Sequence, residues 1–320
     1  MTQKNAQIFY EEGLKFAESN MHEKAVESFK KALEIEPLFQ KAYSELGYAL
    51  GNLNQYGEAL ESFEKALKIE NTPAALYGHG LTVYYMADYQ TAIESFKKVI
   101  GLDESQWAYY YLSRCYFNLQ EYFNALDALD KSIALNHDFM EAWNDRGVIY
   151  SILNEDENAL KSFQEVLKIK PDYEPAIYNL GTTLADMGHY PEALECLNRI
   201  LENDPKNFKA LFYKGNVLFL LKKSEEALKL FEKALKIDPH HSEVWNYHGC
   251  VLASMGKNEE AAQSLQQALK LYPQYEAALM NLGVVYRALE NIEEALQCFE
   301  KVLQINPDNS EALKEINELK

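Results

Sequence analysis

Small and hydrophobic residues recur along the chain with a period of 33 or 34 residues. An alanine marks this period, and its nine copies are Ala25, Ala59, Ala92, Ala125, Ala159, Ala193, Ala227, Ala261 and Ala295. Such a period indicates an array of one small motif, so the fold is inferred from the repeat. With the alanine at position 20, the repeats are residues 6–39, 40–72, 73–105, 106–139, 140–173, 174–207, 208–241, 242–275 and 276–309.

The apolar positions inside each repeat follow the spacing of two helices. Positions 4, 7, 8 and 11 fall on one side of a first helix, and positions 20, 24 and 27 on one side of a second. Position 8 is glycine in eight repeats and Ser113 in the other, while position 24 is phenylalanine or leucine throughout. Small residues at positions 8 and 20 let the backbones approach, and large residues at positions 4 and 24 fill the adjoining space. The pattern predicts a helical hairpin in every repeat.

The prolines and the C-terminal segment agree with this interpretation. Six repeats carry proline at position 32, where it closes the second helix, and no proline interrupts a predicted helix interior. Residues 310–320 are predicted to form one more helix, with Leu313, Ile316 and Leu319 on its apolar side. A stack of repeats needs a capping element with a polar outer face, and this segment suits that role. We expect about 80% helix and no strands, far above the usual helical content.

The repeat pattern resembles the tetratricopeptide repeat, W-x2-L-G-x2-Y followed by alanine, phenylalanine, alanine and proline, in nine copies over residues 6–309. This resemblance implies an all-α fold, a right-handed α-solenoid superhelix of helix-turn-helix repeats. The first helix of each repeat (helix A) would line the concave face and the second (helix B) the convex face. Because no linker or second composition interrupts the chain, we expect residues 1–320 to form a single array ending in the capping helix.

Composition narrows the range of partners. The net charge is −18, with 49 acidic against 31 basic side chains, which disfavours binding to nucleic acid and to anionic membrane surfaces. No apolar run is long enough to span a bilayer, and the first seven residues lack a hydrophobic signal region. The four cysteines lie in different repeats without paired or metal-binding spacing. They indicate reduced cysteines in a cytoplasmic protein.

The sequence contains no pattern typical of an enzyme. A glycine-rich phosphate loop, a nucleophile elbow and a paired-cysteine motif are all missing. The stretch His240-His241-Ser242-Glu243 contains metal-ligand types, but a solvated loop between repeats explains it more simply. We therefore expect a non-catalytic protein without a metal site or a cofactor.

Aromatic residues gather at positions that the resemblance places on the exposed side of helix A (positions 2, 5, 6, 9, 12 and 13). The candidate peptide-binding residues are Tyr77, Leu81, Tyr84, Tyr85, Trp107, Tyr110, Tyr111, Arg114, Phe117, Glu141, Asn144 and Asp145, with Phe212 and Asn216 in the seventh repeat. Exposed aromatic surface commonly marks a binding patch. The alternative is that these rings pack neighbouring A helices together. Trp107, and Tyr111 beside Arg114, are the less usual choices and the best candidates for contact.

Charge along the chain is uneven. Residues 101–160 contain eleven acidic and three basic side chains. One interpretation is a solvated convex face, and the other is attraction of a basic segment by the fourth and fifth repeats. Position 5 carries no lysine in any repeat, so the lysine-asparagine clamp of related co-chaperones for acidic tails is not expected.

Taken together, these patterns favour a cytoplasmic adaptor that holds a protein or peptide ligand in its concave groove. Apolar anchors would sit in the middle, and Glu141 and Asp145 would meet basic residues of the ligand. One alternative is a self-associating structural protein, with Phe212, Phe219 and Leu220 packed against another copy. The other is the targeting subunit of an enzyme carried on a separate chain.

Overall fold

The computed structural model describes residues 3–320. Met1 and Thr2, which begin the segment expected to lack a signal region, lie outside the described residues. Helices make up 80% of the chain, and residues 3–320 contain no strand. The predicted helical content and the all-α solenoid of helical repeats are confirmed.

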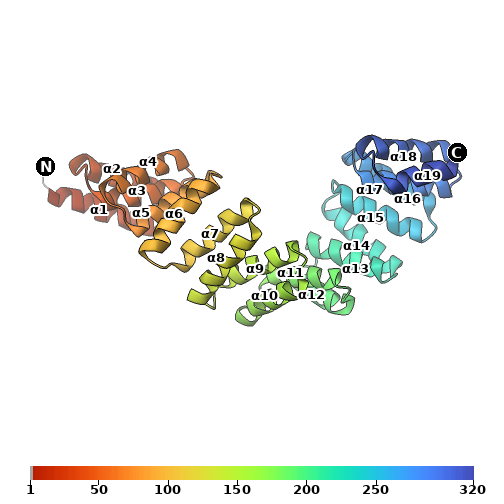
Figure 1. The fold of residues 1–320 in the computed structure, drawn as a ribbon, viewed down its shortest axis with the longest axis horizontal. Coiled ribbons are helices and arrows are strands. Elements are labelled where there is room, and N and C mark those ends of the chain that lie inside the picture. Colours follow the sequence, from red (N-terminus) through yellow and green to blue (C-terminus); the bar gives the residue numbers. More distant parts are fainter. Residues whose placement is uncertain (1–2) are drawn as a thin grey trace. The chain divides into compact units, whose positions relative to one another are not determined.

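Helices A and B alternate through the nine repeats, as Figure 1 shows within each part of the chain. The helices A are α1 (Gln3–Glu18), α3 (Gln40–Asn52), α5 (Pro73–Tyr85), α7 (Gln106–Asn118), α9 (Met140–Ile152), α11 (Glu174–Asp186), α13 (Phe208–Leu220), α15 (Ser242–Ser254) and α17 (Glu276–Ala288). The helices B are α2 (His22–Ile35), α4 (Tyr56–Ile69), α6 (Tyr89–Leu102), α8 (Tyr122–Leu135), α10 (Asp156–Ile169), α12 (Tyr190–Asn203), α14 (Ser224–Ile237), α16 (Asn258–Leu271) and α18 (Ile292–Ile305). The predicted C-terminal helix is α19 (Ser310–Leu319).

The chain divides into two compact units, which we describe separately. The N-terminal unit ends at Ile169 and holds α1 to α10, and the C-terminal unit, Lys170–Lys320, holds α11 to α19. A single continuous array over the whole chain stays a prediction.

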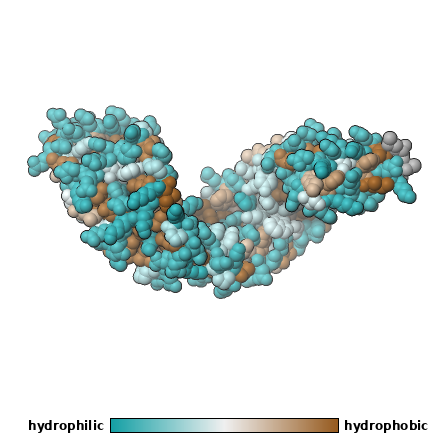
Figure 2. All heavy atoms as spheres, turned by 180° about the vertical axis from the view of Figure 1, so that it is seen from behind, coloured by the Kyte–Doolittle hydropathy of each residue, from teal (hydrophilic) through white to brown (hydrophobic). Residues whose placement is uncertain are grey.

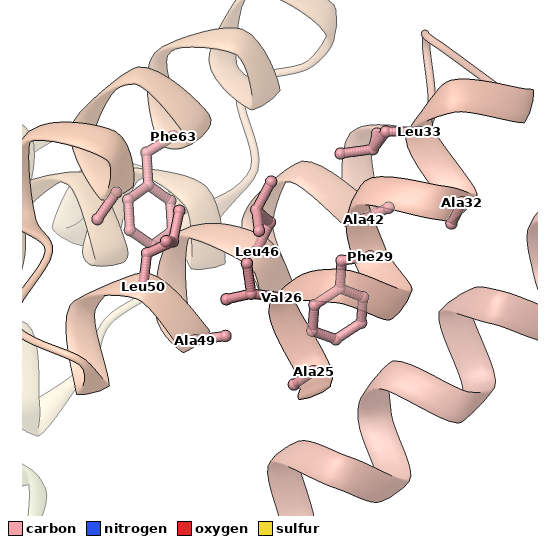
Figure 3. Close-up of a cluster of buried hydrophobic side chains, with 11 residues drawn as sticks. Ala25, Val26, Phe29, Ala32, Leu33, Ala42, Leu46, Ala49, Leu50 and Phe63 are labelled. Carbon is pink, nitrogen blue, oxygen red and sulfur yellow. The ribbon is translucent and has the colours of Figure 1, made fainter. Parts of the chain in front are cut away.

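The core of each repeat is the contact predicted between positions 8 and 24. Phe63 is buried on α4, and a Cβ atom added to Gly47 on α3 would lie 2.7 Å from its ring. Phe29 occupies the same place one repeat earlier, beside Ala25 and Ala32 (Figure 3). In the repeats with phenylalanine at position 24, any side chain at position 8 would collide with that ring, so packing requires glycine there. The fourth repeat accommodates Ser113 at position 8 because position 24 is the smaller Leu129.

Every turn between helix A and helix B has the same backbone form. The residue at position 15 has a positive φ in all nine repeats, from Asn20 to Glu290. The next N–H then donates to the carbonyl at position 11, as from Met21 to Phe16 and from Asn291 to Tyr286. This left-handed turn satisfies carbonyl groups that the end of helix A leaves open.

The helices A lie on the inner side of each unit. Successive A helices contact each other, for example α3 with α5 and α15 with α17, whereas no two B helices within the described part of the chain approach to a similar extent. Hydrophilic residues cover most of the face seen in Figure 2, and the apolar side chains show only in smaller patches between them. The inner surface of each unit is therefore built from helix A side chains, which include all the predicted contact residues.

Candidate binding surface on the helices A

An aromatic cluster joins the third and fourth repeats in the N-terminal unit. The ring of Tyr111 on α7 lies 6.1 Å from that of Tyr77 and 5.6 Å from that of Tyr84, both on α5. It also stacks 5.9 Å from Phe96 on α6, which is fully buried. Partial burial of the Tyr111 hydroxyl among these rings raises the pKa of Tyr111 to about 12. Tyr111 is thus a neutral phenol at physiological pH, held in place by three other rings.

A cavity of about 540 Å³ opens beside this cluster. Its lining is formed by Pro73, Ala74, Tyr77, Val99, Asp103, Ser105, Trp107 and Tyr111. We call these eight residues the aromatic pocket. Trp107 and Tyr111 are four residues apart on α7 and therefore share one face of that helix. The pocket combines three aromatic side chains with one carboxylate, and no basic side chain lines it.

Trp107 is the most exposed ring of the aromatic pocket. Its side chain is 45% exposed, although its ring packs 4.6 Å from that of Phe139. The other two tryptophans behave differently, because the indole N–H of Trp143 donates to the carbonyl of His137 at 2.8 Å, and that of Trp245 to the carbonyl of Pro239 at 2.9 Å. The Trp107 indole N–H makes no hydrogen bond within residues 3–320. Its ring and its N–H are both open to a partner.

Arg114 and Asp145 form a second, more polar group. The Arg114 guanidinium donates to the Tyr110 hydroxyl at 3.3 Å and lies over the rings of Tyr84 and Tyr110. Burial raises the pKa of Asp145, while the positive charge of Arg114 acts in the opposite direction. Both residues line a smaller cavity of about 180 Å³, together with Ser113, Phe117, Val148 and Ile149. Asp145 therefore already has a basic neighbour within the chain.

The predicted contact residues differ widely in exposure. Tyr85, Trp107 and Arg114 are exposed. The half-buried ones are Tyr77, Leu81, Tyr84, Tyr111, Phe117, Glu141, Asn144, Asp145 and Asn216. The expectation of exposure is wrong for Tyr110 and Phe212, which are 6% and 5% exposed.

Packing against the next repeat explains this correction at both residues. Tyr110 lies 5.0 Å from Phe139, in the turn that leads to the next helix A. Phe212 lies 5.5 Å from Tyr247 on the next helix A, so it offers little surface to a second copy of the chain. Of the residues expected to self-associate, Leu220 is exposed and Phe219 half-buried. The helical period places position 5 on the inner side, but at Tyr110 and Phe212 the following repeat covers it, whereas Tyr77 and Tyr178 at the same position stay half-buried.

Two residues of this surface were missed from the sequence. Phe139 supports both Trp107 and Tyr110, and its position 34 is also aromatic at Phe39 and Tyr173. Asp103 lines the aromatic pocket at position 31 of a repeat that has 33 residues. The 33-residue length of this repeat indicated, from the sequence alone, that the turn after Asp103 differs from the turns of the 34-residue repeats.

The C-terminal unit contains an equivalent pocket between the sixth and seventh repeats, which we call the lysine pocket. Its cavity of about 530 Å³ is lined by Glu174, Pro175, Tyr178, Asn179, Asp204, Lys206, Asn207, Phe208 and Lys209. Tyr178 meets Tyr213 at 5.3 Å with a T-shaped geometry, as Tyr77 meets Tyr111. The ammonium group of Lys209 lies 5.8 Å from the centre of the Tyr178 ring. Here the chain places its own cation on the tyrosine.

The histidine pair of the loop at 240–241 has structural roles. The His241 ring accepts the Val244 N–H at the start of α15, and the His240 N–H donates to Asp238. Within residues 3–320, no group of three or more histidine, cysteine, aspartate or glutamate side chains is placed to hold a metal ion. All four cysteines are unpaired. In the same part of the chain, no helix combines the length and the apolar character needed to cross a membrane.

We compared the chain with known protein families and solved structures to identify its family. Tetratricopeptide repeat models match residues 6–37, 28–61, 141–173, 178–242, 249–290 and 277–309. The model of anaphase-promoting complex, cyclosome, subunit 3 matches residues 52–132. No curated protein sequence matches the chain.

Solved structures of similar fold include a tetratricopeptide repeat protein from Parabacteroides merdae, with 19% identity, a TM-score of 0.64, and coverage of 77% of this chain and 98% of that one. The C-terminal part of a repeat-containing protein from Cytophaga hutchinsonii has 16% identity, a TM-score of 0.59, and coverage of 75% and 99%. YrrB, described as a TPR protein with an unusual peptide-binding site, has 26% identity, a TM-score of 0.47, and coverage of 59% and 97%. From the repeated matches and the helical hairpins, the chain belongs to the tetratricopeptide repeat family.

Proposed function

We propose that this protein is a non-catalytic adaptor that binds an extended peptide or a partner helix on the helices A of its third to fifth repeats. Repeats of this family form scaffolds for protein-protein interaction. The observation that carries the proposal is the aromatic pocket, with Trp107 half exposed and its indole N–H unused. An exposed ring that is held by neighbours anchors a partner with little loss of conformational entropy.

The charge of this region supports a basic partner segment. Arg114, Lys131 and Arg146 are the three basic residues between positions 101 and 160. Lys131 is paired with Asp127, and Arg146 with Asp130. Most of the eleven acidic residues therefore remain without a basic partner from this segment. The same excess of acid disfavours nucleic acid as a ligand.

We place the protein in the cytoplasm as part of this proposal. The support is the chemistry of the cysteines, which are unpaired and include three buried thiols. Burial raises the pKa of Cys115 to about 12, so this thiol is not activated for reaction. Such cysteines suit a reducing compartment.

The proposal is tested by selecting binders from a random dodecapeptide phage library against the full chain. The affinity of a selected peptide is then measured by calorimetry for the wild type, for Trp107→Ala, and for Phe123→Ala as the control. Phe123 on α8 is a matched exposed aromatic residue, 74% exposed and on a helix B. We expect Trp107→Ala to weaken binding about tenfold or more, as for an interface hot spot, and Phe123→Ala to leave it unchanged. No selected peptide, or equal affinities for the two variants, would contradict the proposal.

A further inference from the structure

We propose that the aromatic pocket takes a lysine side chain of the partner, with its ammonium group held by the rings of Tyr77, Trp107 and Tyr111 and by the carboxylate of Asp103. This inference rests on the proposed function, because it assigns the chemistry of one contact on the same surface. Three observations carry it. A lysine fills the equivalent pocket of the C-terminal unit, position 2 is tryptophan here instead of that lysine, and the Asp103 carboxylate has no bonding partner in the described chain.

The lysine pocket shows which group this place in the repeat accepts. Tyr77 and Tyr178 both stand at position 5, and each makes a T-shaped contact with the tyrosine at position 6 of the next repeat. In the C-terminal unit the Lys209 ammonium lies over the Tyr178 ring. Attraction between an ammonium group and the negative face of an aromatic ring explains this contact. Among residues 3–320, no cation lies over the equivalent rings of Tyr77 and Tyr111; Arg114 lies over Tyr84 and Tyr110 instead.

Position 2 of the following repeat makes the difference. It is Lys209 in the seventh repeat and Trp107 in the fourth. The tryptophan supplies a third aromatic side chain, and tryptophan is the ring that attracts cations most strongly. The aromatic pocket therefore has a better binding surface for a cation, and no basic side chain of the described chain lines it. We assign that cation to another chain.

Asp103 supplies the negative charge because its turn is one residue shorter than most. In three of the longer turns the residue at position 31 accepts the N–H two residues further on: Asn136 from Asp138 at 3.1 Å, Asp204 from Lys206 at 3.0 Å and Asp238 from His240 at 2.9 Å. In the third repeat the next helix begins with Ser105 as its N-cap, and Asp103 makes no such bond. Its carboxylate has no hydrogen bond or ion pair with any residue of the described chain.

The charge of the pocket selects the occupant. Asp103 is the only charged residue among the eight that line it. An acidic side chain would meet an unpaired carboxylate, and an apolar side chain would leave that carboxylate without a partner. A lysine places its methylene chain along the rings and its ammonium at the carboxylate. Lysine is preferred over arginine because Lys209 is the cation seen at the equivalent tyrosine.

The first experiment tests the pocket without a peptide. Nα-acetyl-lysine N-methylamide is titrated into the full chain labelled with ¹⁵N, and the three indole N–H signals are followed by NMR. Trp107→Phe identifies the Trp107 signal. The matched probe is the same compound acetylated on Nε, which has no charge. We expect the Trp107 signal alone to move, and only with the charged compound.

Two variants separate the carboxylate from general charge effects. Asp103→Asn should weaken the response of Trp107 about fivefold, as for loss of one charge-assisted contact, while Asp204→Asn, at the same position of the sixth repeat, should leave it unchanged. Equal responses to the charged and the acetylated compound, or equal effects of the two variants, would overturn the inference.

The second experiment distinguishes this inference from the proposed function. In a peptide selected from the library, each lysine is replaced by Nε-acetyl-lysine, and the affinity is measured for the wild type and for Asp103→Asn. We expect one lysine to be coupled to Asp103, so that the variant costs about fivefold for the original peptide and nothing for the acetylated one. Tight binding without such a lysine would overturn the inference and leave the proposed function standing. If the lysine compound shifted the Trp107 signal but no peptide were selected, the proposed function would be contradicted and the pocket's preference for lysine would stand.

Discussion

The aromatic pocket and the lysine pocket share one framework and differ in what fills it. Each is built on a tyrosine at position 5, a second tyrosine at position 6 of the next repeat and an aspartate at position 31. In the lysine pocket Lys209 lies over Tyr178, and Asp204 accepts a backbone N–H. In the aromatic pocket, no cation of the described chain lies over Tyr77, and the Asp103 carboxylate has no hydrogen bond or ion pair within residues 3–320. The open pocket thus differs from the internally filled one at position 2, which is tryptophan instead of lysine, and in the turn after position 31, which is one residue shorter.

The floors of the two pockets differ as well. Below the tyrosines, position 24 is Phe96 in the third repeat and Leu197 in the sixth, and both are fully buried. Phe96 contacts the rings of Tyr77 and Tyr111 at 5.8 and 5.9 Å. The tyrosines of the aromatic pocket therefore rest on a third ring, whereas the equivalent position in the sixth repeat is aliphatic.

The largest expected effect comes from removing this support. Phe96→Ala should lower the free energy of unfolding by about 3–5 kcal/mol, because it leaves a cavity where a whole ring was buried. Phe96→Leu, which copies the floor of the lysine pocket, should cost less than about 1.5 kcal/mol. Urea unfolding followed by circular dichroism measures both. Equal losses of unfolding free energy in the two variants would contradict this explanation, because leucine fills most of the cavity that alanine leaves.

A smaller effect is expected when the aromatic pocket is made to resemble the lysine pocket. Trp107→Lys places an internal cation beside Tyr77, as Lys209 lies beside Tyr178. It should weaken a lysine-containing peptide about tenfold or more, through lost ring contact and repulsion between like charges. The lost ring contact with Phe139 should lower the free energy of unfolding by about 0.5–1.5 kcal/mol. Calorimetry and urea unfolding of the same sample test the two parts. Unchanged affinity would remove Trp107 from the binding surface.

The reciprocal change should give only a modest gain. Lys209→Trp opens the ring of Tyr178, so Nα-acetyl-lysine N-methylamide should now affect the new indole signal in an NMR titration. Binding should stay several-fold weaker than at the aromatic pocket, because Asp204 is bonded to the Lys206 N–H and Lys206 itself lines the cavity. Affinity equal to that of the aromatic pocket would show that a free carboxylate at position 31 is unnecessary.

The sequence predicted the helical framework of these pockets, but not which of their side chains are buried or lack a bonding partner. The alanine and glycine spacing was sufficient for the helical hairpins, since only small residues fit where two helices touch. The buried positions of Tyr110 and Phe212 were missed, because the helical period shows which side a residue occupies and not what the next repeat lays over it. The left-handed turns were also hidden. Asn20 and Gly188 suggest them, whereas Lys222 and Glu290 adopt the same φ without any such preference.

The free carboxylate of Asp103 was beyond the sequence for a different reason. Position 31 is aspartate in the third, sixth and seventh repeats, so residue type does not distinguish them. The difference lies in whether a backbone N–H two residues later reaches the side chain, and this depends on the path of the turn. The 33-residue spacing indicated that this path changes. It did not show which polar group would lose its partner.

The smallest expected effect concerns a feature that should be the same in both units. His79 and His248 both stand at position 7, and their rings bond to Ser95 and Ser264 at 2.9 and 3.0 Å. Burial lowers the pKa of each histidine, so the folded state favours the neutral ring. The stability from this preference is complete above the unfolded pKa, near 6.5, and is lost as the pH falls through the lower folded value.

We therefore expect His79→Gln and His248→Gln each to reduce the loss of stability between pH 7 and pH 5, measured by urea unfolding at a series of pH values. The control is His137→Gln, which makes the same substitution at an exposed histidine in the turn between the fourth and fifth repeats. If His79 and His248 gave opposite changes, the two units would not share one framework at this position. The contrast between the aromatic pocket and the lysine pocket could then no longer be assigned to Trp107, Lys209 and the turn at Asp103 alone.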